Sequence, residues 1–94
     1  MEIIGRKKIA DAYKMNPHWK SSLVRWARIV EEAGWDHVPA MRQTFSSADP
    51  VGQYVIFNIG GNKARLAAIV KFQQKRVIIS EILSHEDYDR EDWE

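Results

Sequence analysis

The strongest hydrophobic pattern of this chain lies between residues 53 and 83. Three apolar, β-rich runs follow one another there. Two short polar breaks separate them, Gly60-Gly61-Asn62 and Gln73-Gln74-Lys75. Short breaks of this kind between β-rich runs are typical of β-hairpins. We therefore predict an antiparallel three-stranded meander over this stretch.

The middle run of the meander alternates between two faces, as a strand with a side-chain period of two requires. One face carries Leu66, Ala68, Val70 and Phe72, and the other carries Lys63, Arg65, Ala67, Ile69 and Lys71. The first face is apolar and is predicted to point into a core. The second face carries three cations and no acid, which is the clearest indication of a ligand surface in the sequence.

Two helices are predicted ahead of the meander. Residues 6–15 suit a short helix, and Asn16-Pro17 ends it, because the residue before a proline avoids helical backbone while proline suits the first turn of a new helix. An apolar stripe then recurs at helical steps of four, three and four. It consists of Trp19, Leu23, Trp26 and Val30. This stripe predicts a second helix whose tryptophans pack in the core, and Gly34 is predicted to close it as a C′ glycine.

The remaining segments complete an α+β prediction. Residues 2–5 suit a short edge strand that can pair in parallel with a strand of the meander. Residues 35–52 show no sustained period and are predicted to be a loop, held to the body by Trp35, Val38, Met41 and Phe45. Ser84 and Asp87 suit a short helical turn after the last strand. The order β-α-α-β-β-β predicts a helical hairpin packed on a mostly antiparallel sheet, and the length predicts one domain over residues 1–94.

Composition and charge narrow the function classes. The chain has no cysteine, which excludes disulfides, thiolate metal sites and a cysteine nucleophile. No apolar run approaches the roughly 20 residues that span a bilayer, and no signal peptide is evident, so we expect a cytoplasmic protein. Residues 1–30 hold seven lysines and arginines against two acids, whereas residues 81–94 hold one against seven. A basic body suggests a polyanion partner, although a solvated helix surface and a solubilising tail would give the same pattern.

Metal and nucleotide sites find little support. The three histidines are scattered, and none has the spacing of a zinc site. His85 with Asp87 and Asp89 suits only a weak cation site. A P-loop and a serine nucleophile elbow are absent. The remaining candidates for a chemical role are the cations of the middle strand and a tail that carries the imidazole of His85 and the phenol of Tyr88.

That set of side chains suits metal-free cleavage of RNA. In this chemistry the neighbouring 2′-hydroxyl attacks the phosphate, and the reaction needs a base, cations that hold the phosphorane charge, and an acid for the 5′ oxygen. Histidine is a common general acid or base, so His85 suits either role. Tyr88 suits proton donation or stacking on a base, and Arg65 suits bidentate binding of a phosphate. A non-catalytic RNA-binding surface would carry the same residues.

The segments VIFNIGGNKARLAAIVKF and SHEDYDREDW resemble the HigB toxins of type II toxin–antitoxin modules, within the RelE/ParE superfamily. The most specific part is GNKxRL followed, after the next hairpin, by a tail of the form [ST]HxxYD. IGRKKIADAYKMNP, LVRWARIVEEAGW and the loop around Phe45 extend the resemblance over nearly the whole chain. It implies a RelE-like α+β ribonuclease that cleaves mRNA on the ribosome without a cofactor. It also implies a HigA-like antitoxin, through which alone operator DNA would be bound.

The resemblance assigns roles to individual residues. Arg65, His85 and Tyr88 are the expected catalytic residues, with Arg65 on the phosphate, His85 in acid or base work, and Tyr88 in stacking or proton donation. The expected RNA-binding residues are Lys63, Lys71 and Asp89, of which Asp89 is the better suited to orienting a neighbour or capping the chain. No metal is expected. The alternative is a non-enzymatic protein, either a ParE-like gyrase poison or an RNA-binding module.

Overall fold

The structure is a computed structural model that describes residues 1–89. Its elements are β1 (Glu2–Ile4), α1 (Arg6–Met15), the 3-10 helix η1 (Pro17–Trp19), α2 (Lys20–Glu32), α3 (Val38–Thr44), β2 (Asp49–Val51), β3 (Tyr54–Ile59), β4 (Ala64–Lys71), β5 (Arg76–Ser84) and α4 (His85–Asp89). The predicted α+β class is confirmed. Within residues 1–89, no helix is long and apolar enough to cross a membrane.

One five-stranded sheet, in the order β1-β5-β4-β3-β2, organises the fold. The predicted meander is confirmed, because β3, β4 and β5 pair antiparallel in sequence. The first strand lies at the edge, and its parallel pairing with a meander strand is also confirmed, since Glu2–Ile4 align with Arg76–Ile78. The first and last thirds of the chain therefore pair within one open sheet, whose central strand is β4.

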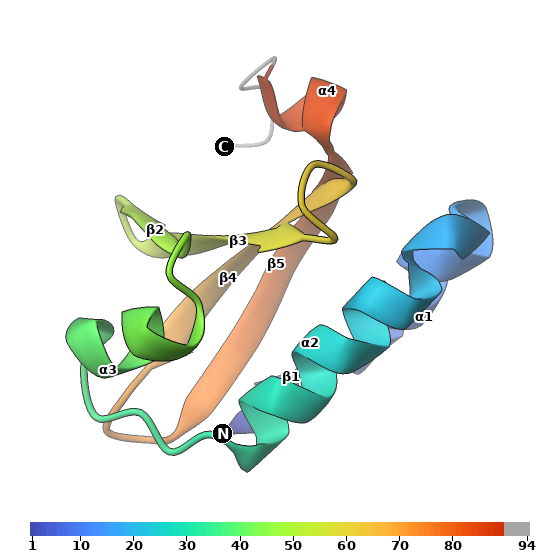
Figure 1. Ribbon diagram of the computed structural model, residues 1–94. Coiled ribbons are helices and arrows are strands. Elements are labelled where there is room, and N and C mark those ends of the chain that lie inside the picture. Colours follow the sequence, from blue (N-terminus) through green and yellow to red (C-terminus); the bar gives the residue numbers. More distant parts are fainter. Residues whose placement is uncertain (90–94) are drawn as a thin grey trace.

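The core lies between one face of the sheet and the helices α1 and α2, which run side by side (Figure 1). The predicted stripe of the second helix is confirmed: Trp19, Leu23, Trp26 and Val30 are each at most 5% exposed. The ring of Trp26 meets Phe57 of β3 edge to face, with 5.4 Å between ring centroids. Leu66 and Ala68 of β4 are fully buried against the same core, so the predicted inward face of this strand is correct.

The prediction of a loop over residues 35–52 is wrong. Val38–Thr44 forms α3, whose start is capped by the His37 Nδ1 atom, which accepts a hydrogen bond of 3.3 Å from the Ala40 N–H. Asp49–Val51 forms β2, which pairs with β3. The predicted anchoring of this segment is correct, because Met41 is fully buried in the core. Seven helical residues span only two turns, which is too few for a period to stand out.

The prediction for Gly34 is also wrong. Helix α2 ends at Glu32, and its C-cap residue Ala33 is extended, with φ −79° and ψ 154°, so no left-handed glycine follows the last turn. The α-ammonium of Met1 occupies this end instead and donates to the carbonyl oxygens of Val30, Glu31 and Ala33 at 3.1, 3.3 and 2.6 Å. The last turn of α2 holds no basic side chain, and this ammonium supplies the positive charge that a helix C-terminus favours.

Lys75 ties the β4–β5 hairpin to the connection between α2 and α3. Its backbone has a positive φ of 57°. Its ammonium donates to the carbonyl oxygens of Gly34 and Trp35, at 3.2 and 2.9 Å, and to Asp36 Oδ1 at 2.6 Å. This hydrogen bond, helped by the charge of Lys75, lowers the pKa of Asp36 below its ordinary value. One end of the sheet is thus fixed by polar contacts between distant parts of the chain.

Candidate functional site

The opposite end of the sheet brings the β3–β4 turn and α4 together. Ala64, the first residue of β4, is paired with Ser84, the last residue of β5. The glycine turn directly precedes Ala64 and helix α4 directly follows Ser84, so the two segments are neighbours at this end (Figure 1). The register of one hairpin therefore places the two segments GNKxRL and SHxxYD beside each other.

Arg65 is held by the turn that precedes it. Its Nη1 atom donates to the carbonyl oxygens of Gly61 and Ala64, both at 3.2 Å, and its Nη2 atom donates to Asn62 Oδ1 at 3.4 Å. All three acceptors are neutral, so these contacts orient the guanidinium without neutralising its charge. Arg65 is half-buried, and a guanidinium that is fixed in this way suits binding of a phosphate.

His85 opens helix α4 and contacts Asp89 within the same helix. Its Nδ1 atom lies 2.8 Å from Asp89 Oδ2, one helical turn later, and the His85 side chain is 40% exposed. A carboxylate at Nδ1 favours the tautomer with its proton there, which leaves the Nε2 lone pair as an acceptor. The Ser84 hydroxyl accepts a hydrogen bond of 3.1 Å from the Asp87 N–H, so the predicted short helical turn with its Ser84 cap is confirmed.

The glycine turn is also pressed against the helices. Gly60 has φ 58°, and a Cβ atom placed on it would lie 2.7 Å from the Ser22 hydroxyl and 2.8 Å from Lys63 Cδ. The Lys63 ammonium lies 3.4 Å from the carbonyl oxygen of His18 and donates to it. Lys63 thus precedes β4 and reaches towards the helical side. The prediction that it shares the outer face with Arg65 is wrong, because residues of a turn do not follow the alternation of a strand.

Lys71 does not join this site. It is paired with Arg76 at the far end of the β4–β5 hairpin, about 20 Å along the strand from Arg65 at roughly 3.3 Å per residue. The predicted convergence of Lys71 with Arg65 and His85 is therefore wrong, because alternation fixes the face of a strand residue and not its distance along the strand. A role of Lys71 in RNA binding stays a prediction.

The remaining predicted residues lie on α4. Tyr88 is half-buried and Asp89 is exposed, and the contact of Asp89 with His85 is the kind expected of a residue that orients its neighbour. Within residues 1–89, no group of three histidines and acids is arranged to hold a metal ion. Residues 90–94, at the end of the predicted acidic tail, lie outside the described part of the chain.

Three partners of the site are not evident from the sequence alone. They are Asn62, Ser22 and the carbonyl oxygen of His18. Asn62 could have been found, since it sits in the turn directly before the arginine and its side-chain oxygen can only serve groups nearby. The other two come from the helical hairpin, and no local pattern connects them to a turn some forty residues later.

Residues 19–91 match the model of a protein family described as HigB_toxin, RelE-like toxic component of a toxin-antitoxin system. The chain belongs to this family of HigB toxins. It is also 28% identical over 92 residues, covering 95% of this chain and 88% of the relative, to proteins from Escherichia coli K12 and Shigella flexneri named mRNA interferase toxin HigB and mRNA interferase HigB. A further mRNA interferase HigB, from Escherichia coli O6:H1, is 25% identical over 93 residues, covering 96% of this chain and 90% of the relative. The resemblance inferred from the sequence is thereby confirmed.

Proposed function

We propose that this HigB toxin is an mRNA endoribonuclease that inhibits translation and is neutralised by a HigA-like antitoxin. The observation that supports the proposal is the location of Arg65 and His85 at the same end of the sheet, because Ala64, next to Arg65, is paired with Ser84, next to His85. The names of the relatives, which describe mRNA interferases, support the same reaction and the same substrate.

The proposed reaction begins with the 2′-hydroxyl of the substrate. The Nε2 atom of His85 takes its proton, and Asp89 at 2.8 Å from Nδ1 stabilises the imidazolium that forms. A bond forms between the 2′ oxygen and phosphorus, and the bond from phosphorus to the 5′ oxygen breaks. Arg65 binds the phosphate oxygens as their charge grows. Tyr88 donates a proton to the departing 5′ oxygen, or stacks on a base while water supplies that proton, and the products are a 2′,3′-cyclic phosphate and a 5′-hydroxyl.

We place this reaction on the ribosome. Glu86, Asp87 and Asp89 surround His85 on its own helix, and their negative charges weaken the binding of free RNA at this end of the sheet. A substrate that is held and aligned by the ribosome does not depend on the toxin for most of its binding energy. We therefore expect cleavage of translated mRNA to be much faster than cleavage of the same RNA in buffer.

The test is a map of transcript ends by primer extension after brief induction of the toxin. The wild-type chain should produce new ends within coding regions, and His85→Ala should reduce their rate of formation by about 10²–10⁴, the usual contribution of an acid–base group. Arg65→Ala should give a loss of about 10²–10³, comparable to that of a charge-stabilising donor. Arg42→Ala, an exposed arginine of α3, is the matched control and should cleave normally.

Two results would contradict the proposal. One is full cleavage by folded His85→Ala and Arg65→Ala variants, which would place the chemistry elsewhere. The other is growth arrest with intact transcripts and altered DNA supercoiling, which would favour the gyrase-poison alternative. Circular dichroism of each variant shows whether its fold is retained.

A further inference from the structure

The outer edge of β5 is covered over only part of its length. Strand β1 pairs with Arg76–Ile78 and no further, because Gly5, with φ 95°, turns the chain away beside Ile79 and α1 then begins. Strand β5 continues to Ser84. Within residues 1–89, the stretch from Ile79 to Ser84 is therefore paired with a strand on its β4 side alone.

The first part of this edge is protected. Ala67 is paired with Glu81 and Ala68 with Ile79, so Ser80 is the additional residue of a β-bulge. The Lys8 ammonium donates to the Ser80 carbonyl oxygen at 2.8 Å. A bulge and a lysine are common devices against unwanted pairing of an edge. Neither the bulge nor the contact with Lys8 extends beyond Ser80, so these two features leave Glu81–Ser84 unprotected.

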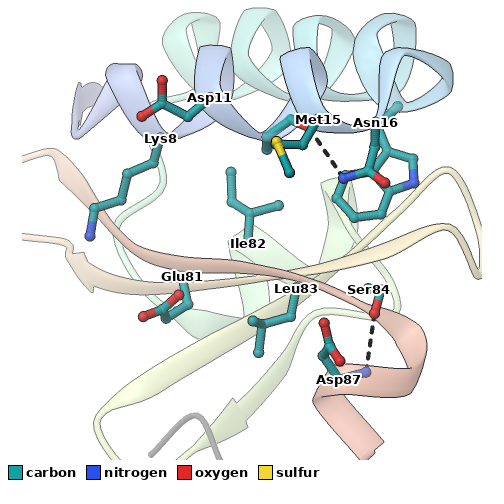
Figure 2. Close-up of a pocket in the computed structure, with 11 residues that line it drawn as sticks. Lys8, Asp11, Met15, Asn16, Glu81, Ile82, Leu83, Ser84 and Asp87 are labelled. Atoms are coloured by element: carbon teal, nitrogen blue, oxygen red, sulfur yellow. Dashed lines mark hydrogen bonds between the residues drawn. The ribbon is translucent and has the colours of Figure 1, made fainter.

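A groove of about 590 Å³ lies along those four residues. Its other wall consists of α1 and η1, with Ala12, Met15 and Trp19, and Figure 2 shows Ile82 directed towards this wall while Glu81 and Leu83 point away from it. Met15 at the rim is 82% exposed. The groove thus combines an open strand edge with an apolar wall that a side chain of an added strand could contact.

The charges of the groove exclude RNA as its ligand and favour a basic peptide. Its lining holds the three acids Asp11, Glu81 and Asp87 against the single cation Lys8, and Lys8 is already bound to the Ser80 carbonyl. A polyanion would meet a net negative surface here. An extended segment with lysine or arginine would meet carboxylates from α1, β5 and α4.

We propose that this groove binds an extended, basic segment of the antitoxin, which adds to the sheet as a short strand along Glu81–Ser84. The inference rests on the proposed function in that it takes the antitoxin as the partner. Ser84 and Asp87 join the groove to the cap of α4. A strand bound there fixes the position of α4, and so of His85, without covering Arg65.

The first experiment measures hydrogen exchange of the full chain, alone and in complex with its HigA-like antitoxin. Amides of Glu81–Ser84 that face away from β4 should exchange at least about tenfold more slowly in the complex. Protection confined to other elements, such as α2, would overturn the proposal while leaving the antitoxin partnership intact. Failure of the two proteins to form a complex would overturn both the partnership and this groove as its site.

The second experiment tests whether antitoxin binding depends on the charge of the groove or only on the net charge of the toxin. Glu81→Lys should weaken antitoxin binding about tenfold or more, as expected for reversal of an interfacial charge. Glu32→Lys, an exposed glutamate of α2 outside the groove, makes the same change of charge and should leave the Kd within about twofold. Equal effects of the two variants would overturn the proposal. Transcript cleavage by the free wild-type chain is measured in parallel, so a failure of the ribonuclease proposal is seen separately.

Discussion

Replacement of Gly60 by alanine tests whether the glycine turn packs tightly against the helical hairpin. Gly60 and Gly61 both have positive φ, 58° and 71°, so alanine costs each of them roughly 1–2 kcal/mol of backbone strain. A Cβ on Gly61 would meet nothing within 4 Å, whereas a Cβ on Gly60 would lie 2.7 Å from the Ser22 hydroxyl and 3.3 Å from Ser22 Cβ. Overpacking of this kind costs about 1–3 kcal/mol. We therefore expect Gly60→Ala to be less stable than Gly61→Ala by about 1–3 kcal/mol.

Urea unfolding followed by tryptophan fluorescence measures this difference. A third variant identifies its cause: Ser22→Ala removes the nearest atom, so the cost of Gly60→Ala should fall by at least about 0.5 kcal/mol in the Ser22→Ala background. The same cycle with Gly61→Ala should be additive, because Gly61 has no such neighbour. Equal stability of the two glycine variants, or a cost of Gly60→Ala that Ser22→Ala leaves unchanged, would refute this tight packing.

Three further predictions concern the core, the contact between Lys75 and Asp36, and the Ser84 cap of α4. Leu23→Ala should lower the free energy of unfolding in urea by about 2–5 kcal/mol, because the side chain is fully buried. Val24 is next to it and 42% exposed, so Val24→Ala should cost about 0.5 kcal/mol or less. Similar costs for the two variants would contradict the packing described for α2. Because the pKa of Asp36 is lowered, its contact with Lys75 stabilises the fold above pH 3.8, and this stabilisation is lost as the pH falls through the lowered pKa. The melting temperatures of Asp36→Asn and the wild type should therefore differ near neutral pH and converge in acid. A difference in melting temperature that persists at pH 2 would contradict this prediction. Ser84→Ala should destabilise α4 by about 0.5–2 kcal/mol and speed the exchange of its amide hydrogens. Ser84→Asp keeps a capping oxygen and should restore slow exchange. The same exchange rate in both variants would show that the cap does not stabilise α4.

Much of the fold could be predicted because several local patterns agreed. The glycine turn, the alternation along β4 and the stripe from Trp19 to Val30 each indicated one structure, and the structure has all three. Helix α3 could not be predicted, because a helix of two turns gives no clear period and its start is capped by His37, an unusual capping residue. Gly34 does not cap α2, because the carbonyl oxygens at the end of this helix accept from the α-ammonium of Met1, at the start of the chain.

The site was only partly predictable for a related reason. The location of Arg65 and His85 at the same end of the sheet follows from the connectivity of the β4–β5 hairpin, which the sequence reveals. The distance of Lys71 depends on strand length and register, and the direction of Lys63 depends on the helices beneath the turn. These are long-range quantities, and a pattern of alternating residues carries no information about them.

The pairing of β1 with β5 has a consequence for how this toxin is made. Glu2 and Arg76 are 74 residues apart in the chain and are joined by an ion pair of 2.9 Å. During synthesis, β1 emerges first and has no partner until almost everything else has been translated. Helix α4, with His85, comes later still. A nascent chain therefore lacks both its complete sheet and its proposed base, so a ribosome that is making this toxin does not face the finished toxin on its own nascent chain.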